Sequence, residues 1–144
     1  MFLANFNIVK QNLKIMKKNL GLAITAFSLF LVSFTPFYSI EDVVTAMRSG
    51  NATQLSKYFD NRIDISLPGK FDNYSKSQAE MILKDFFSRN EVKSFRVKQK
   101  GEQSGSQFCI GVLQTNHASY RTKFYMKKKG DKQVLQELGF EIVE

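Results

Sequence analysis

Cysteine, histidine and tryptophan are nearly absent from this sequence, and these absences exclude several kinds of site. Cys109 is the only cysteine among 144 residues, so the chain can form neither an internal disulfide nor a cysteine-rich metal centre. His117 is the only histidine, and a Ser-His-Asp triad would need it beside a nucleophile such as Ser119. The hairpin pattern places His117 on a turn instead. We therefore predict no metal, no cofactor and no catalytic residue.

Basic residues exceed acidic ones, but the position of the excess matters. The formal net charge is +8, yet Lys10, Lys14, Lys17 and Lys18 all precede the long apolar run. From Pro36 onward, 17 basic and 13 acidic residues leave only +4. This weak excess selects no partner, and no set of stacking aromatics or binding motif accompanies it, so we expect no nucleic-acid partner.

The N-terminal part has the pattern of an export signal. The basic pair Lys17-Lys18 precedes an apolar run from Leu20 to Val32, which is short of the roughly 20 residues that span a membrane. Residues 16–38 are predicted to be a signal peptide or N-terminal anchor, and residues 1–15 an upstream extension. The alternative is the apolar start of a buried helix. No Ala-x-Ala motif marks a cleavage site, and the small residues available are Ser33, Thr35 and Ser39.

Three amphipathic helices are predicted after this segment. Ser39 can cap the first helix, and Gly50 suits its C-terminal end. Asn51, with Gln54 three residues later, opens a second, short helix. A capping box at Ser75 precedes the third helix, which carries a clear apolar stripe. The apolar residues of these helices recur at the three- and four-residue spacing that amphipathic helices show.

Alternating residues predict strands in the rest of the chain. Residues 62–67 form one strand, residues 71–74 return as a short partner, and a meander of four strands follows. Three-residue turns at 116–118 and 129–131, and an even-length loop within 101–105, set apolar residues opposite one another on one face. In this register Ile110 lies opposite Phe124 and Phe95, Val112 opposite Thr122, Phe124 opposite Gln136, and Met126 opposite Val134. The predicted inward side chains are Phe95, Val97, Phe108, Ile110, Val112, Tyr120, Thr122, Phe124, Met126, Val134, Gln136, Leu138 and Phe140.

The order of these elements predicts a single α+β domain over residues 39–144. One face of a curved antiparallel sheet must be covered, and three N-terminal helices are available to cover it. This order resembles the cone-shaped, cystatin-like fold of the nuclear transport factor two-like superfamily. Five short motifs are similar to a family of short exported bacterial proteins of unknown function: Ser49-Gly50-Asn51-Ala52, Tyr74-Ser75-Lys76-Ser77-Gln78-Ala79-Glu80, Asp85-Phe86-Phe87, Ile110-Gly111 and Tyr120-Arg121. The resemblance implies this fold and export, and it carries no catalytic residues.

The predicted inner wall has no Asp, Glu or His. Asp64 is the best remaining acid, but it shares its side of the strand with Arg62 and Ser66 and is expected to face solvent. Cys109 is expected to point away from the inner wall as a structural or partly covered thiol. An apolar cavity with a few polar groups would suit a small apolar ligand, and the residues predicted to line it are Tyr120, Thr122, Phe124, Gln136 and Phe108. A packed core is the alternative interpretation.

The outer face of the same sheet is predicted to be basic. Outside the cytoplasm, the anions available to such a face are lipid head groups, cell-surface polysaccharides and acidic proteins. An ordinary solvated surface is the alternative, because the predicted register places Glu137 opposite Lys123 and so neutralises part of the charge. The residues predicted to form this basic face are Arg96, Lys98, Lys123, Lys127 and Lys129.

These features favour a non-catalytic exported domain that binds a ligand or an anionic surface partner. We expect it in the periplasm or at the cell surface, with membrane contact only through the N-terminal segment. Two other functions stay open. One is a small-molecule enzyme of the isomerase or hydrolase type, with Asp64 or His117 reaching the pocket. The other is a structural homodimer formed through the sheet.

Overall fold

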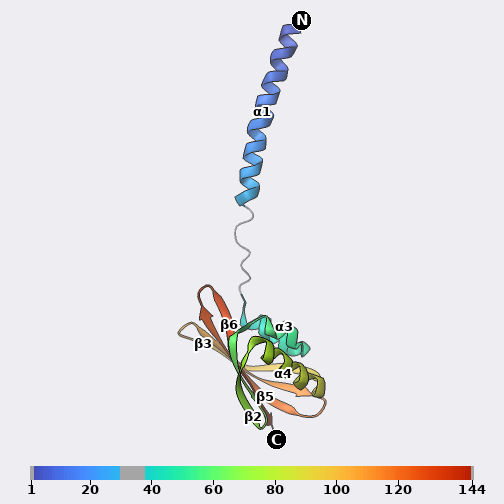
Figure 1. Ribbon diagram of the computed structural model, residues 1–144, viewed down its shortest axis with the longest axis vertical. Coiled ribbons are helices and arrows are strands. Elements are labelled where there is room, and N and C mark those ends of the chain that lie inside the picture. Colours follow the sequence, from blue (N-terminus) through green and yellow to red (C-terminus); the bar gives the residue numbers. More distant parts are fainter. Residues whose placement is uncertain (1, 30–37, 144) are drawn as a thin grey trace. The chain divides into compact units, whose positions relative to one another are not determined.

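The computed structural model describes residues 2–29 and 38–143, which form two separate units (Figure 1). The first unit is helix α1 (Phe2–Leu29), which continues without a break through Met16. None of the helices in these described ranges is both long and apolar enough to span a bilayer. The end of the predicted apolar run and two of the three candidate cleavage residues, Ser33 and Thr35, lie outside the described residues.

Within residues 38–143, the chain forms three helices and six strands. The helices are α2 (Ile40–Ser49), α3 (Ala52–Ser56) and α4 (Lys76–Arg89). The strands are β1 (Phe59–Leu67), β2 (Lys70–Ser75), β3 (Val92–Gln103), β4 (Ser106–Thr115), β5 (Ser119–Lys129) and β6 (Lys132–Val143).

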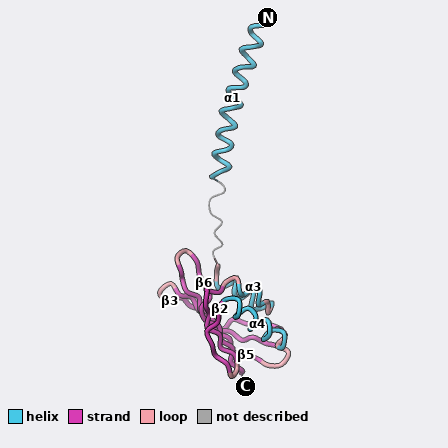
Figure 2. The backbone as a smooth tube through the Cα atoms, viewed as in Figure 1, coloured by secondary structure: helices cyan, strands magenta, loops and turns pink. Residues whose placement is uncertain are grey.

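The strands form one curved sheet in the order β2-β1-β6-β5-β4-β3, and the helices lie together on one side of it (Figures 1 and 2). The predicted α+β fold is therefore confirmed. One pair departs from the predicted antiparallel sheet, because β1 and β6 run parallel. The long connection through β2, α4 and the meander allows this direction.

Local hydrogen bonds set the helix ends, as the capping signals predict. The Ser39 side chain caps α2 in a box with Asp42, and Ser75 caps α4 in the same way with Gln78. The side chain of Asn51 accepts the backbone N–H of Gln54 at 2.9 Å at the start of α3. These bonds satisfy backbone donors that have no partner inside a helix.

The predicted register of the β4–β5 hairpin is wrong by one residue. The Thr115 hydroxyl accepts the backbone N–H groups of His117 and Ala118 at 3.2 and 3.1 Å, so the turn closes between Thr115 and Ala118. Cys109 consequently lies opposite Phe124. A slip of one residue moves every side chain of a strand to the other face. The buried residues of β4 are therefore Cys109, Gly111, Leu113 and Thr115, while Phe108, Ile110 and Val112 point outward.

The other two hairpins also differ from the predicted pairing. The β5–β6 turn closes between Lys129 and Lys132 around Gly130, one residue shorter than predicted. A register shift after Tyr125 then changes the pairing along the two strands. A further shift in β3 skips Lys98. The resulting pairs are Phe124 with Leu138, Met126 with Leu135, Phe95 with Leu113, and Ile110 with Gln99 and Lys123.

The core lies between the helices and the inner face of the sheet. Phe86 of α4 contacts Phe140 at 4.7 Å and Tyr120 at 5.3 Å between ring centroids. Cys109 is fully buried in the same core, contrary to its predicted outward direction. The inner face is therefore covered by packed side chains from α2, α3 and α4.

Side chains and bulges protect the two edges of the sheet. At the β2 edge, the Asp72 carboxylate accepts the Asn73 backbone N–H, and Arg62 donates to the Asn73 carbonyl, both at 2.8 Å. At the β3 edge, the register breaks at Lys93 and Lys98. Occupied backbone groups, bulges and lysines all oppose pairing with another strand.

Gly50 provides a test of the junction between α2 and α3. Gly50 has φ 59°, and a β-carbon there would lie 2.8 Å from Cγ2 of Val92. Gly69 has φ 75° and open space around it. In urea unfolding, Gly69→Ala should cost about 1 kcal/mol from the left-handed backbone alone. Gly50→Ala should cost about 1–3 kcal/mol more, because the added carbon overlaps Val92. Equal losses from the two variants would contradict the contact with Val92.

Candidate binding surface

Three of the five predicted pocket residues lie on the inner face of the sheet. Tyr120 is 6% exposed, and Thr122 and Phe124 are fully buried. The Tyr120 hydroxyl donates to Asn90 at 2.9 Å, and the Thr122 hydroxyl donates to the Tyr120 carbonyl at 3.3 Å. Their polar groups are thus used inside the protein, and the side chains belong to the packed core.

The other two predicted pocket residues, Phe108 and Gln136, lie outside the core. Phe108 points outward because of the β4 register, and its ring lies 5.9 Å from the Tyr125 ring at an interplanar angle of 28°. A β-carbon on Gly101 would overlap the Phe108 ring, so this glycine makes room for it. Gln136 is half-buried and donates to the Asp60 carboxylate at 3.1 Å. The predicted pocket is therefore divided between two faces.

The three remaining chemical candidates, His117, Asp64 and Cys109, lie on a turn, on the outer side of β1 and in the core, respectively. His117 is exposed on the β4–β5 turn, as predicted. Asp64 points to the outer side and accepts the side-chain amide of Asn73 at 2.6 Å, while its neighbours Ile63 and Ile65 are buried. Burial raises the pKa of the Cys109 thiol to about 11, which keeps it protonated at neutral pH.

The outer face of β5 carries a row of basic side chains. Arg121, Lys123 and Lys127 alternate with buried residues along this strand. Val112 of β4 pairs with Arg96 of β3 on one side and with Arg121 of β5 on the other, so the two arginines flank Val112. This row confirms the predicted outward direction of Lys123 and Lys127.

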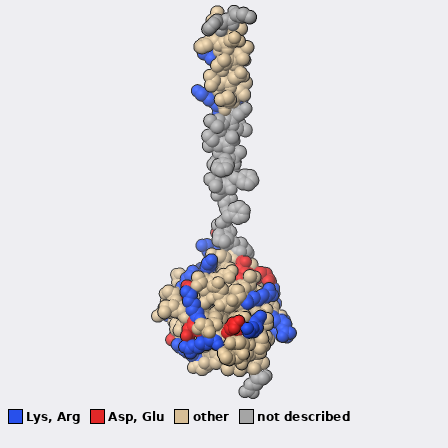
Figure 3. Space-filling view, turned by 90° about the vertical axis from the view of Figure 1, so that its right-hand side faces the viewer, with Lys and Arg blue, Asp and Glu red and all other residues tan. Residues whose placement is uncertain are grey.

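Acidic neighbours neutralise part of the predicted basic face. Lys123 lies 3.7 Å from the Glu137 carboxylate, which it reaches diagonally because Glu137 pairs with Tyr125. Lys129 forms an ion pair with Asp60 at 2.8 Å. Among the described residues, Arg96, Arg121 and Lys127 form no such pair. Figure 3 likewise shows acidic groups interspersed among basic ones on the side of the domain that it presents.

Hydrogen bonds from Lys129 and Gln136 lower the pKa of Asp60 to about 2. The Asp60 carboxylate is therefore ionised at every physiological pH. It joins the start of β1 to the β5–β6 hairpin, across 69 residues of sequence.

Apolar side chains accompany the basic row on the neighbouring strand. Phe108, Ile110 and Val112 point outward from β4, and each lies opposite a residue of β5: Tyr125, Lys123 and Arg121. Tyr125 is 46% exposed. We define these six side chains, with Arg96 and Lys127, as the outer β4–β5 surface.

Comparison with known proteins identifies the family. Residues 40–141 match the model described as "Domain of unknown function (DUF4783)". The chain belongs to the DUF4783 family. The resemblance noted in the sequence is thus confirmed as far as the family and its bacterial relatives are concerned.

Solved structures of DUF4783 proteins share this fold. A family member from Bacteroides uniformis is 29% identical, with a TM-score of 0.72, and the match covers 74% of this chain and 99% of that one. A member from Bacteroides ovatus is 27% identical, with a TM-score of 0.69, covering 72% and 94%. An NTF2-like protein of unknown function from Cytophaga hutchinsonii is 9% identical, with a TM-score of 0.56, covering 77% and 95%, which shows the fold alone. No curated protein matches the chain.

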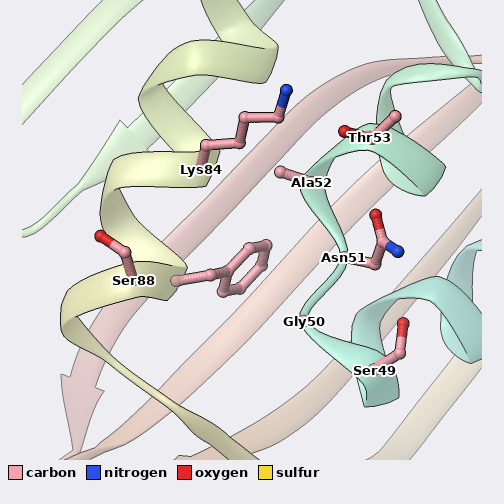
Figure 4. A pocket seen from close by; sticks show the side chains of 8 residues that line it. Ser49, Gly50, Asn51, Ala52, Thr53, Lys84 and Ser88 are labelled. Atoms are coloured by element: carbon pink, nitrogen blue, oxygen red, sulfur yellow. The ribbon is translucent and has the colours of Figure 1, made fainter.

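The DUF4783 chain also has a cleft that the sequence did not reveal. It measures about 390 Å³ and lies between the α2–α3 junction, residues 49–53, and one side of α4 (Figure 4). Lys84 extends from α4 toward Thr53, and both side chains bind Glu80, at 2.9 and 2.8 Å. The caps at Gly50 and Asn51 explain the motif that resembled the family, because these residues connect two helices. One wall of the cleft is therefore formed by the turn between α2 and α3.

Cys109 gives a test of the inner packing. Raising its pKa from 9.0 to about 11 lowers the thiolate fraction at pH 8 about 100-fold. Full burial adds steric protection. In the folded protein, a disulfide reagent should therefore react at least about 100-fold more slowly than in urea. Similar rates in both conditions would contradict the burial of this thiol.

Asp60 gives a test of the link between β1 and the β5–β6 hairpin. Asp60→Asn should lower the free energy of unfolding at pH 7 by up to about 1 kcal/mol. The folded pKa is depressed, so the stabilisation is present above the usual value of 3.8 and is lost as pH falls toward about 2. The stabilities of wild type and variant should converge over that range. Asp131→Asn on the neighbouring turn is the control, and an equal effect there would contradict the assignment.

Proposed function

We propose that residues 38–143 form a non-catalytic domain that acts outside the cytoplasm and binds an anionic polymer through the outer β4–β5 surface. One observation carries the proposal: a row of exposed cations on β5 lies beside a half-buried, outward-facing aromatic and aliphatic row on β4. Cations attract an anionic ligand, and aromatic side chains supply contact area at low conformational cost.

The spacing of the row favours an extended ligand over a small anion. Alternate residues of a strand lie about 7 Å apart, so Arg121, Lys123 and Lys127 extend over about 20 Å. Repeated charges on a linear polymer could contact all three at once. A single phosphate or carboxylate would reach only one of them.

The inner face and the sheet edges support a partner on the outer face. Among the described residues, the buried set contains no Asp, Glu, His, Lys or Arg, which leaves acid-base chemistry without a buried group. The tightly packed inner face supports an external partner over a small apolar ligand inside the sheet. The protected edges at β2 and β3 oppose binding by strand addition.

The N-terminal sequence supports a role outside the cytoplasm. Lys17-Lys18 followed by the apolar run is typical of export signals or N-terminal anchors. Among the anions available in the periplasm or at the cell surface, an acidic polysaccharide is the one that forms an extended polymer with repeated carboxylates, as the spacing of the β5 row requires. We therefore take an acidic polysaccharide as the partner.

Charge reversal on β5 tests the proposal. Titration calorimetry at low salt should show that the protein binds polygalacturonate and that added salt weakens binding. Arg121→Glu with Lys127→Glu should weaken it at least about tenfold, a loss of about 1.4 kcal/mol. Tyr125→Ala should weaken it as well, because it removes aromatic contact area.

The control variant reverses two charges on the other side of the domain. Lys57 and Lys76 are exposed at the ends of α3 and α4. Lys57→Glu with Lys76→Glu changes the net charge by the same amount and should leave the affinity nearly unchanged. Equal losses in both double variants, or no binding by wild type, would overturn the proposal.

A further inference from the structure

Helix α1 carries an exposed apolar stripe with the spacing of a coiled coil. Phe6, Val9, Leu13 and Met16 recur at alternating intervals of three and four residues, and they are 59%, 55%, 48% and 65% exposed. These positions correspond to a and d of a seven-residue repeat, which face the partner helix in coiled coils. The same spacing continues in the sequence at Leu20, Ala23 and Phe27.

The polar residues on the two flanks of the stripe differ, with lysines on one flank and asparagines on the other. Lys10 and Lys17 occupy the e positions, next to the stripe, and the Lys10 ammonium lies 4.5 Å from the centre of the Phe6 ring. Asn5 and Asn12 occupy the g positions on the other flank of the stripe. No lysine occupies an a, d or g position. Residues at e and g set partner choice and orientation in coiled coils.

We propose that, in the chain that keeps this segment as an N-terminal anchor, α1 pairs in parallel with α1 of a second copy of this chain, through the a and d stripe. In a parallel pair, each g residue faces the e residue of the next repeat. Asn5 would face Lys10 of the partner subunit, and Asn12 would face Lys17 of the partner subunit. The lysine ammonium can donate to the asparagine carbonyl oxygen. An antiparallel pair would bring e against e, and thus lysine against lysine, which is repulsive.

An anionic membrane surface is the competing occupant of this helix. The first 40 residues contain four lysines and no acidic residue, which would suit such a surface. A helix lying in that interface buries one broad apolar face. In α1, Ile8 and Ile15 are both 57% exposed on a different side of the helix, separated from the stripe by the g asparagines. The narrow a and d stripe fits a partner helix better.

Disulfide trapping tests the pairing in the full chain, kept in mild detergent. Leu13→Cys places a thiol on the stripe, and Ile15→Cys places one on the other side as the matched control. Cys109 is buried and does not compete for oxidation. Oxidised Leu13→Cys should run at twice the 16.6 kDa of one chain, and Ile15→Cys should remain at that mass. Equal cross-linking of both variants would contradict the assigned face.

Paired substitutions separate self-association from lipid binding. Val9→Asn with Leu13→Asn should abolish the dimer in light scattering, while Ile8→Asn with Ile15→Asn should leave it intact. A monomeric wild type, or equal loss in both pairs, would overturn the proposal. Binding to anionic vesicles that falls equally in both pairs, with no dimer in wild type, would identify the membrane as the occupant. Residues 38–143 form a separate unit, so folding of the domain and its polygalacturonate binding report on the other proposal independently.

Discussion

The hydroxyl group of Thr115 sets the register of the β4–β5 hairpin, and the division of the sheet into a core face and a solvent face depends on it. It accepts two backbone N–H groups and donates to the Ala118 carbonyl at 2.9 Å. These bonds close the turn after two intervening residues. A turn one residue longer would move Cys109 and Leu113 into solvent and Phe108 into the core.

Glycines allow aromatic rings to lie against both faces of the neighbouring β3–β4 hairpin. On the inner face, the Phe95 ring occupies the space that a β-carbon of Gly111 would need. On the outer face, Phe108 does the same at Gly101. Aromatic rings that cover glycines across strands are a known way to hold a curved sheet in register. The same ring–glycine contacts therefore hold side chains in place both in the core and on the outer β4–β5 surface.

Prediction from sequence succeeded where the information was local. The caps at Ser39, Asn51 and Ser75 depend on hydrogen bonds that reach only three residues along the chain. The outward row on β5 was also predictable, because charged and apolar residues alternate there without ambiguity. In β4 the outward residues Phe108, Ile110 and Val112 are more apolar than the buried Cys109, Gly111 and Thr115, so alternation indicated the wrong face. This misled the prediction for Phe108, and the register shift between β5 and β6 did the same for Gln136.

The sequence by itself determined the α+β class, the positions of the helices and strands, and the basic row of β5. These features follow from residue periodicity and short-range hydrogen bonds. Only the tertiary structure decided which face of β4 is buried, that β1 runs parallel to β6, and that Asp60 pairs with Lys129. The reason is physical: these outcomes depend on turn closure and on contacts between distant segments, and neither leaves a periodic signal in the residues themselves.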